Sequence, residues 1–476
     1  MTGFLFFWSG RVHNEKKSMK SSRISLLIVF FLTLAHGEGA ADSGGQKHFG
    51  TDEAHYKYSE RIAEIGDGES GINNISWNYL EPQPPENGEH TYRWELIDAR
   101  YQKIKASGRA LQIDIEPTNV WACEFDSSVI VVDPALDPRS APRKGNAIRK
   151  IKPQYRTDWK LFVEALIKRY PTEHLQIGSE AENIWSNAAG YIEAVSLARE
   201  AAQGVNPKIV IMAAGFNTAE LFALSPAAQK KWLANPVAKR KLVFIQEFIK
   251  YGGGCFDVLC LHLNRDYAYI PSTVAWFKNE MKKNNYQKPV WSDDMASGHW
   301  LYDYDQIRKL KMADREAISE YRAGQSAMLV KKSVVAFSSG VDKVYVTSEV
   351  DWEHYIVPQW NYMGLLDSQG TRKPAFFTYK LMVSKLDGFL HVERVSENIY
   401  SFSFPDKAPV VVAWNDRERE TIDLSNIFSV KEVAIEHIIT HTGERSVDAR
   451  GKVSSVKEIV ISPEPVFIEA FQQRSN

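Results

Sequence analysis

The sequence is poor in cysteine, in net charge and in long apolar runs. It has 476 residues but only three cysteines, Cys123, Cys255 and Cys260, an odd number that offers no disulfide framework. No Cys/His cluster has the spacing of a metal site, so we expect neither a metal nor a cofactor. The formal net charge is −1, which excludes a strongly basic nucleic-acid-binding protein. Stability must therefore come from a large apolar core, which a chain of this length allows.

One short apolar run lies close to the N-terminus. Ile24–Leu34 follows the cationic stretch Met19–Arg23 and precedes small residues, the arrangement of a signal peptide and its cleavage site. This run is too short to span a bilayer comfortably, and no later run is long or apolar enough to do so. We predict a signal peptide region over 1–37, with Met19 as a candidate true start, and a flexible linker over 38–47. The mature protein is then secreted, periplasmic or at the cell surface; an uncleaved membrane anchor is the alternative.

From about His48 to Asp387, apolar strand-like runs alternate with amphipathic helical patterns. The strand candidates are Ile72–Ser76, Ala110–Ile115, Leu175–Gly178, Ile209–Ala213, Val258–His262, Val290–Ser292 and Lys343–Thr347. The helical patterns are Trp94–Ser107, Asp158–Arg169, Ala188–Gln203, Pro236–Tyr251, Pro271–Asn284 and Ala317–Ser338. Such strands predict a parallel sheet buried on both faces. An eighth strand, near Thr51 or within the polar insertion Phe125–Tyr155, would close them into a (β/α)8 TIM barrel. An open doubly wound sheet would need a Gly-rich phosphate turn, which is absent.

After Asp387 the pattern changes to short apolar runs separated by turns. The runs are Val392–Phe404, Val410–Trp414, Thr421–Leu424, Val433–His437, Val456–Ile461 and Val466–Phe471. No helical pattern lies between them, so we predict a small antiparallel β-sandwich. The expected organisation is a barrel domain over 48–387 followed by a β-sandwich domain over 388–476.

Two predicted barrel strands end in acidic residues. Leu175–Gly178 is followed after one residue by Glu180, and Val290–Ser292 runs into Asp293 and Asp294. The C-terminal strand ends form the active-site mouth of such barrels. Two carboxylates that face each other there are what cleavage of a glycosidic bond requires; helix caps or solvated loop charges are the alternative. Strand alternation predicts that only one of the two aspartates points into the mouth, and we assign Asp294.

Five motifs in a fixed order resemble those of clan A, the large (β/α)8 clan of retaining glycoside hydrolases that use two glutamates. They are Trp77–Pro82 with Tyr92–Asp98, Ile177–Glu180, Asp257–His262, Lys288–Asp294, and Gly364–Asp367 with Lys373–Ala375. A trailing β-sandwich is a usual companion of these barrels. The resemblance implies a divergent member that hydrolyses poly- or oligosaccharides.

Carried over position by position, the resemblance implies that Glu180 is the acid/base and Asp294 the nucleophile. Three positions depart from the family. Ser179 stands where the family has an Asn that hydrogen-bonds the sugar 2-hydroxyl, Asp294 replaces a Glu, and Asn264 replaces a Tyr. Asp is one methylene shorter than Glu, so the carboxylate of Asp294 would lie roughly 1 Å farther from the sugar. Such a displacement can lower the rate on the order of 10²-fold, or it can leave room for a water molecule, which favours inversion.

Other residues near the strand ends are candidate substrate contacts. His262 is either a buried, hydrogen-bonded histidine or a ligand to substrate or nucleophile, and Arg265 either grips a carboxylated sugar or is solvated. To act as an acid Glu180 needs a raised pKa, which Trp185 would supply, while Glu182 is an alternative acid or a helix cap. The predicted substrate contacts are Ser179, His262, Asn264, Arg265, Asn119, Trp121 and Trp352; for the tryptophans, stacking on sugars competes with loop packing.

Three functions are open from the sequence. An exported glycosidase is favoured by the motif order and the carboxylate pair. A catalytically inactive glycan-binding barrel would explain the three departures, and an envelope structural protein that reuses the fold is the third. We expect a carbohydrate partner, no nucleic acid and no membrane span after signal cleavage; the sequence carries no signal for an oligomeric state.

Overall fold

The computed structural model describes residues 47–130, 146–217, 236–297, 315–352, 362–441 and 452–471, together with Lys230 and Ala234. The predicted signal segment lies outside these residues. Among the helices of the described ranges, none combines the length and the apolar character needed to cross a membrane.

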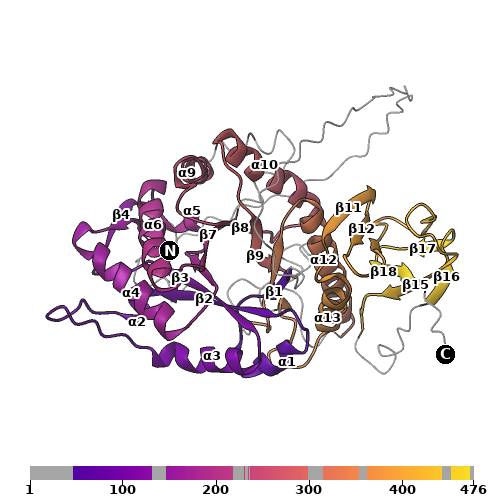
Figure 1. The fold of residues 1–476 in the computed structure, drawn as a ribbon, viewed down its shortest axis with the longest axis horizontal. Coiled ribbons are helices and arrows are strands. Elements are labelled where there is room, and N and C mark those ends of the chain that lie inside the picture. The colour runs from indigo at the N-terminus through magenta and orange to yellow at the C-terminus, as the bar shows by residue number, and fades with distance from the viewer. Residues whose placement is uncertain are drawn as a thin grey trace, which may run out of the picture. The chain divides into compact units, whose positions relative to one another are not determined.

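Eight parallel strands form a closed barrel in the order β1-β10-β9-β8-β7-β6-β3-β2 (Figure 1). They are β1 (Phe49–Thr51), β2 (Glu69–Ser76), β3 (Ala110–Glu116), β6 (His174–Ile177), β7 (Val210–Phe216), β8 (Val258–His262), β9 (Val290–Ala296) and β10 (Lys343–Thr347). The seven strands expected from the sequence are present, and the eighth is β1, near Thr51. The alternative place for it, within the 125–155 insertion, is wrong, because the described part of that insertion forms a separate antiparallel pair, β4 (Cys123–Ile130) and β5 (Asn146–Ile151). The predicted TIM barrel is confirmed.

Helices connect the strands, and the six predicted ones are all present. The α-helices are α1 (Ser59–Ala63), α2 (Trp77–Leu80), α3 (Glu95–Ala106), α4 (Arg156–Arg169), α5 (Ala181–Ile184), α6 (Ala188–Val205), α9 (Pro236–Gly252), α10 (Ile270–Lys283), α12 (Arg315–Ser338) and α13 (Pro374–Leu386); the 3-10 turns are η1 (Tyr56–Tyr58), η3 (Pro153–Tyr155) and η4 (Tyr267–Tyr269). Helix α4 shows why the pattern predicts them. Its buried residues, Trp159, Phe162, Val163, Leu166 and Ile167, recur at the helical period and form one face.

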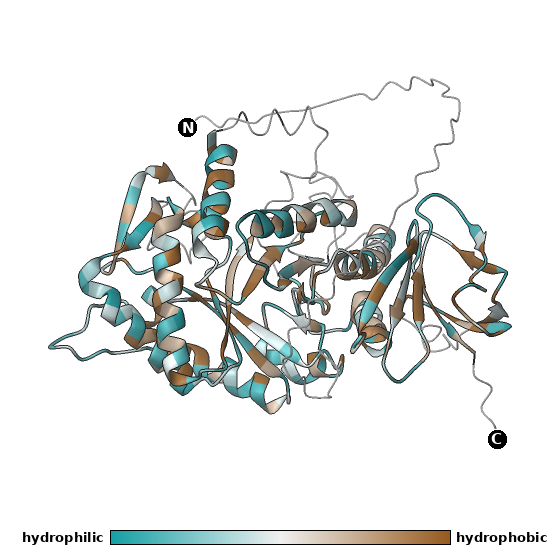
Figure 2. Cartoon of the chain, turned by 45° about the horizontal axis from the view of Figure 1, so that its top comes forward, coloured by the Kyte–Doolittle hydropathy of each residue, from teal (hydrophilic) through white to brown (hydrophobic). Residues whose placement is uncertain are grey.

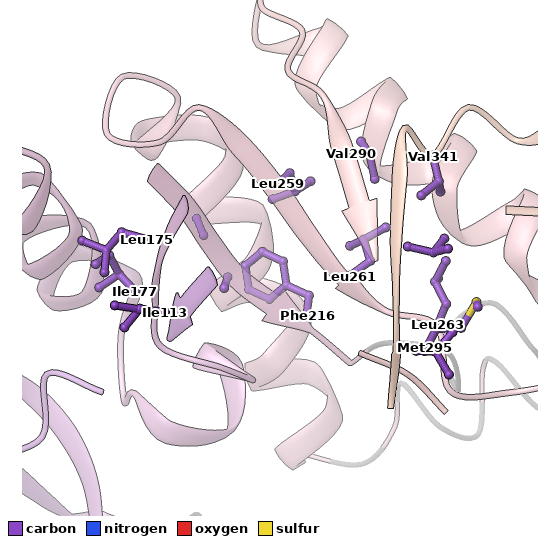
Figure 3. Packing of buried hydrophobic residues seen from close by; sticks show 14 of the residues in the cluster. Ile113, Leu175, Ile177, Phe216, Leu259, Leu261, Leu263, Val290, Met295 and Val341 are labelled. Atoms are coloured by element: carbon purple, nitrogen blue, oxygen red, sulfur yellow. The ribbon is translucent and has the colours of Figure 1, made fainter. Parts of the chain in front are cut away.

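Side chains along the barrel strands alternate between two apolar layers. Leu259 and Leu261 of β8 belong to the outer layer, with Ile113, Leu175 and Ile177 of β3 and β6 (Figure 3). The inner layer is a separate cluster of Met212, Val258, Cys260, Trp291 and Tyr345. Figure 2 shows the helices carrying polar and apolar residues while the strands are largely apolar, as expected for a sheet buried on both faces.

The seam between β1 and β2 is held by side chains more than by the backbone ladder. These strands pair at a single register position, Thr51↔Ser70. The buried carboxylate of Glu349, just after β10, accepts the hydroxyls of Thr51 at 2.9 Å and Ser70 at 3.1 Å, and Arg109 donates to it at 2.8 Å. Arg109 also lies 3.7 Å from Asp67, whose pKa is raised by burial to about 7. This buried ionic cluster therefore joins β1, a strand of only three residues, to β2 and closes the barrel.

The C-terminal region forms antiparallel sheets, as predicted. A six-stranded sheet has the order β11-β12-β13-β18-β15-β16, and β14 pairs with β17 in a second sheet. The strands are β11 (His391–Ser396), β12 (Ile399–Ser403), β13 (Val410–Ala413), β14 (Glu420–Ile422), β15 (Glu432–His437), β16 (Lys452–Ser455), β17 (Ile459–Ile461) and β18 (Val466–Ala470). In β13, Val411 and Ala413 belong to the sandwich core, while Val410 and Val412 belong to the cluster that includes the barrel residues. The large sheet is therefore buried on both faces at β13, while its edge strand β11 is largely exposed.

Replacing Arg109 with leucine tests the seam. The substitution leaves two buried carboxyl groups without their cation, and we expect the free energy of unfolding to fall by about 3–5 kcal/mol. Chemical denaturation measures this loss. Arg149→Leu removes an exposed arginine that lies 3.1 Å from Glu124 and should cost less than about 1 kcal/mol. Equal losses in the two variants would contradict the assignment.

Candidate active site

Asp293 and Asp294 both contact one histidine at the C-terminal end of the barrel strands. The register between β8 and β9 steps from Cys260↔Trp291 to His262↔Asp294, so β9 contains an extra residue here, a β-bulge. Oδ2 of Asp293 lies 3.4 Å from Nε2 of His262, and Oδ2 of Asp294 lies 3.5 Å from its Nδ1. The bulge interrupts the alternation on which the choice of one aspartate rested, so both aspartates contact His262; that Asp294 is the one that points into the mouth stays a prediction.

His262 is the cation at the centre of this group. Its Nδ1 lies 3.3 Å from Oε1 of Glu180, and its Nε2 lies 3.3 Å from Oγ of Ser179. Burial alone would lower the pKa of His262, but the charges of Asp293 and Asp294 outweigh burial and hold the pKa well above 6.5. The structure thus brings three predicted site residues, Ser179, Glu180 and Asp294, together around the imidazolium of a fourth, His262.

A second bulge, in β7, makes room for the histidine. The register between β7 and β8 shifts after Ala213, where Ala214 and Gly215 have φ values of 79° and 50°. This left-handed region is rarely adopted by residues other than glycine. A Cβ atom on Gly215 would lie 2.5 Å from Nε2 of His262 and 2.6 Å from Oδ2 of Asp293. Only glycine fits at this position.

Glu180 is held as a carboxylate. It follows β6 with φ 48° and ψ 48°, a strained conformation for a glutamate. Its Oε1 accepts a hydrogen bond from Asn217 at 2.9 Å, and its Oε2 accepts one from Asn183 at 2.6 Å. Burial would raise the pKa of Glu180, but the hydrogen bond and charge of His262, and after them the hydrogen bonds of Asn217 and Asn183, lower it to about 2. The prediction of a raised pKa beside Trp185 is wrong, because donors surround the carboxylate.

Glu182, the alternative acid, is completely buried, whereas 34% of the Glu180 side chain is exposed. Its Oε1 accepts the backbone N–H of Asn217 at 3.1 Å, so it fastens the end of β7 instead of capping a helix. Burial, and after it the charge of Glu180, raises the pKa of Glu182 to about 8. Its carboxyl group is therefore neutral near pH 7 but has no surface with which to meet a substrate.

Asn264 holds Asp294 in place. Its Nδ2 donates to Oδ2 of Asp294 at 3.1 Å, and its Oδ1 accepts the backbone N–H of Ala296 at 2.7 Å. The buried Lys332 of α12 donates to the carbonyl oxygens of Asn264 at 3.0 Å and Ala296 at 2.7 Å, and burial lowers the pKa of Lys332 to about 7. Arg265, the next residue, is half-buried. Asn264 thus donates to Asp294, the residue at the position of the clan A nucleophile.

The remaining predicted contacts are engaged in loops. Asn119 is fully buried; it donates to the carbonyl oxygen of Glu81 at 3.0 Å and accepts from the backbone of Trp121 at 3.1 Å. The half-buried Trp121 donates its indole N–H to the same carbonyl at 3.1 Å. Trp352 is half-buried after β10 and donates to Oγ of Ser348 at 3.2 Å. Asn119 therefore braces the loops after β2 and β3, and its polar groups are already satisfied.

Sequence reasoning missed three polar residues of this site. Asn183 lies three residues beyond Glu180, and Asn217 follows β7, which was expected to end at Ala213. The sequence signal for Asn217 was its position as a polar residue directly after the apolar run that ends in Gly215-Phe216. Lys332 carried no signal, because a lysine in a long helix is normally exposed.

No protein-family profile and no curated protein matches the sequence. Solved structures do match in fold. A family 39 glycoside hydrolase from the gut symbiont Bacteroides cellulosilyticus has a TM-score of 0.58 at 11% identity, covering 90% of this chain and 81% of that one. A family 39 β-xylosidase from Caulobacter crescentus has a TM-score of 0.56 at 15% identity, covering 90% and 97%. A family 30 endoxylanase from Clostridium papyrosolvens has a TM-score of 0.51 at 12% identity, also covering 90% and 97%.

The chain has the fold of these glycoside hydrolases. Because the similarity extends over both the barrel and the C-terminal sheets, it confirms the architecture that the motif order predicted. At these identities the likeness is one of fold, so what the site does must be argued from the site itself.

Gly215→Ala should distort the centre of the site. The new methyl group would overlap His262 and Asp293, and overpacking of this kind lowers the free energy of unfolding by about 1–3 kcal/mol. Gly204→Ala is the control, since its Cβ meets nothing within 4 Å and a helical alanine is favoured over glycine by up to about 1 kcal/mol. Thermal or chemical denaturation that finds Gly215→Ala as stable as Gly204→Ala would refute the close approach.

Asp293→Asn should lower the pKa of His262, because it removes the first of the charges that raise it. The raised pKa means that the pairing stabilises the fold fully below the unfolded value of about 6.5 and that this stability is lost as the pH rises through the folded pKa. NMR titration of the His262 ring protons measures the shift. Asp257→Asn, at a partly exposed carboxylate that pairs with Arg199, should leave the titration unchanged.

Proposed function

We propose that this protein is an exported glycosidase that acts on poly- or oligosaccharides. The observation that carries the proposal is the placement of two carboxylates, Glu180 and Asp294, on one imidazolium at the C-terminal ends of the barrel strands. This end of the barrel carries the active site in enzymes of this fold. The predicted signal peptide supports export.

The spacing of the carboxylates favours retention of configuration. Oxygen atoms of Glu180 and Asp294 lie 3.3 Å and 3.5 Å from the same nitrogen of His262, so these two oxygens are less than about 7 Å apart. Retaining pairs sit roughly 5–5.5 Å apart and inverting pairs roughly 6.5–9.5 Å. The bound applies to the pair of oxygens that contact His262, and it places them nearer to the retaining than to the inverting spacing. In this proposal Asp294 attacks the sugar and Glu180 protonates the leaving oxygen.

The proton has to reach Glu180, which rests as a carboxylate. We place it on His262, whose Nδ1 contacts both carboxylates. When Asp294 forms its bond to the sugar, its negative charge disappears, and with it part of the attraction that keeps the proton on the imidazole. The Nδ1–H bond then breaks as Oε1 of Glu180 is protonated, and that proton passes to the leaving oxygen. In the second step Glu180 accepts a proton from the attacking water as the bond between Asp294 and the sugar breaks. The restored charge of Asp294 then favours return of that proton from Oε1 of Glu180 to Nδ1 of His262.

The same geometry limits the consequence of the shorter aspartate. Asn264 and His262 hold one oxygen of Asp294, while its buried Oδ1 has no hydrogen-bond partner among the described residues. The Asp294 side chain as a whole is 11% exposed, and in this proposal its exposed part meets the sugar carbon. We assign Ser179 to contact with a sugar hydroxyl, Arg265 to a carboxylated sugar, and Trp121 and Trp352 to stacking on sugar rings.

A glycan-binding barrel without activity is the second candidate. The low pKa of Glu180 favours it, because an ionised residue is not an acid. Hydrolysis that depends on Asp294 distinguishes a glycosidase from a glycan-binding protein, since the latter would bind carbohydrates without releasing products.

Glu180→Gln and Asp294→Asn should each reduce hydrolysis on the order of 10²- to 10⁴-fold, because each removes a proton-transfer or nucleophilic group. Purified protein is assayed against a panel of aryl glycosides and polysaccharides, and proton NMR of the first product gives its anomeric configuration. Glu182→Gln should cost little, since that group is already neutral. Absence of turnover by the wild type, or equal rates for wild type and Glu180→Gln, would refute the proposal; an inverted product would refute retention.

A further inference from the structure

The loop that follows β8 connects the site with the C-terminal sheet. Residues 263–269, here called the β8 loop, begin beside His262 and contain Asn264, which holds Asp294. The loop ends in η4, where the hydroxyl of Tyr267 donates to the carboxylate of Asp416. Asp416 lies in the turn after β13, so a residue of the C-terminal sheet contacts the segment that orients Asp294.

Asp416 gathers donors from three parts of the chain. Nζ of Lys331, on α12, lies 2.7 Å from its Oδ1, and Nδ2 of Asn398 donates to its Oδ2 at 2.9 Å. The Lys331 ammonium also lies 5.7 Å from the ring centre of Tyr267 and 5.9 Å from that of Trp414. Burial would raise the pKa of Asp416, but its hydrogen bonds, from Lys331 first, lower it. The group is therefore a carboxylate held in a fixed direction.

The next residue of α12 reaches the site from inside. Lys332 is fully buried, and its Nζ donates to the carbonyl oxygens of Asn264, in the β8 loop, and of Ala296, two residues after Asp294. Lys332 thus holds the segments on either side of Asp294. Its neighbour on the helix, Lys331, holds Asp416, which in turn contacts the far end of the β8 loop. A shift of α12 or of the β8 loop would move both supports together.

We infer that Asp416 of the C-terminal sheet is a positioning residue for the carboxylate pair, acting through Tyr267 and Lys331 on the β8 loop and α12. This inference rests on the proposed function. Apolar packing between the sheet and the barrel has no preferred direction, whereas charge-assisted hydrogen bonds are directional. The hydrogen bonds of Asp416 therefore fix the orientation of the β8 loop, which contains Asn264 and which apolar packing alone would leave undirected.

A second ionic link between the two regions provides the control. Lys385 of α13 lies 2.9 Å from Glu436 and also pairs with Glu469, both in the C-terminal sheet. Like the Asp416 pair, this link is partly buried, but its two carboxylates lie on β15 and β18 and its lysine on α13. Removing it therefore weakens the attachment of the sheet without acting on the β8 loop.

The experiment compares Asp416→Asn, Tyr267→Phe and the control double variant Glu436→Gln/Glu469→Gln in the full chain. We expect the first two to lower kcat on an aryl glycoside about 3- to 30-fold, because small misplacements of a reacting group are costly, with KM changed less than kcat. Combining them should add little, since they remove one shared interaction. The control should lower the melting temperature comparably and leave kcat within about 2-fold of wild type. Equal kcat for Asp416→Asn and the control would overturn the inference.

A second readout separates this inference from the proposed function. Displacement of Asp294 weakens its attraction for His262, so NMR titration should find a lower His262 pKa in Asp416→Asn and an unchanged one in the control. If the wild type hydrolyses no glycoside, the proposed function falls and this titration alone decides. An unchanged His262 titration in Asp416→Asn would then overturn the positioning role.

Discussion

The attraction between the buried His262 imidazolium and the carboxylates around it is the interaction on which the site depends. Three of them, from Glu180, Asp293 and Asp294, have an oxygen within 3.5 Å of the ring. Without that cation, like charges at this spacing would take up protons or separate. His262 therefore sets both the ionisation of the group and its geometry, and it links the two carboxylates proposed for catalysis.

Backbone irregularities allow this arrangement. Bulges in β7 and β9, the positive φ of Glu180 and the absence of a side chain at Gly215 bring polar groups from three strands to one point. Each has a cost in conformational energy, which the packing of the large apolar core offsets. Strain of this kind is typical of functional sites, and here it replaces the regular alternation that would have turned Asp293 or Asp294 away.

The support of the site extends beyond the barrel. Lys331 and Lys332 are neighbours on α12, yet one contacts Asp416 of the C-terminal sheet and the other the carbonyl groups beside Asp294. In the proposed function, where Asp294 is the nucleophile, the C-terminal region would therefore help to orient it through α12.

The sequence by itself determined the order of strands and helices and the two kinds of architecture, because hydrophobic periodicity is a local property. The grouping of Ser179, Glu180, His262 and Asp294 in one site followed from their positions at strand ends together with the resemblance to clan A. The tertiary structure alone decided the protonation of that site. Trp185 near Glu180 suggested a raised pKa, but Asn183, Asn217 and His262 donate to the carboxylate and lower it. A pKa is the sum of burial, charges and hydrogen bonds from segments far apart in the chain, and no pattern within one segment contains that sum.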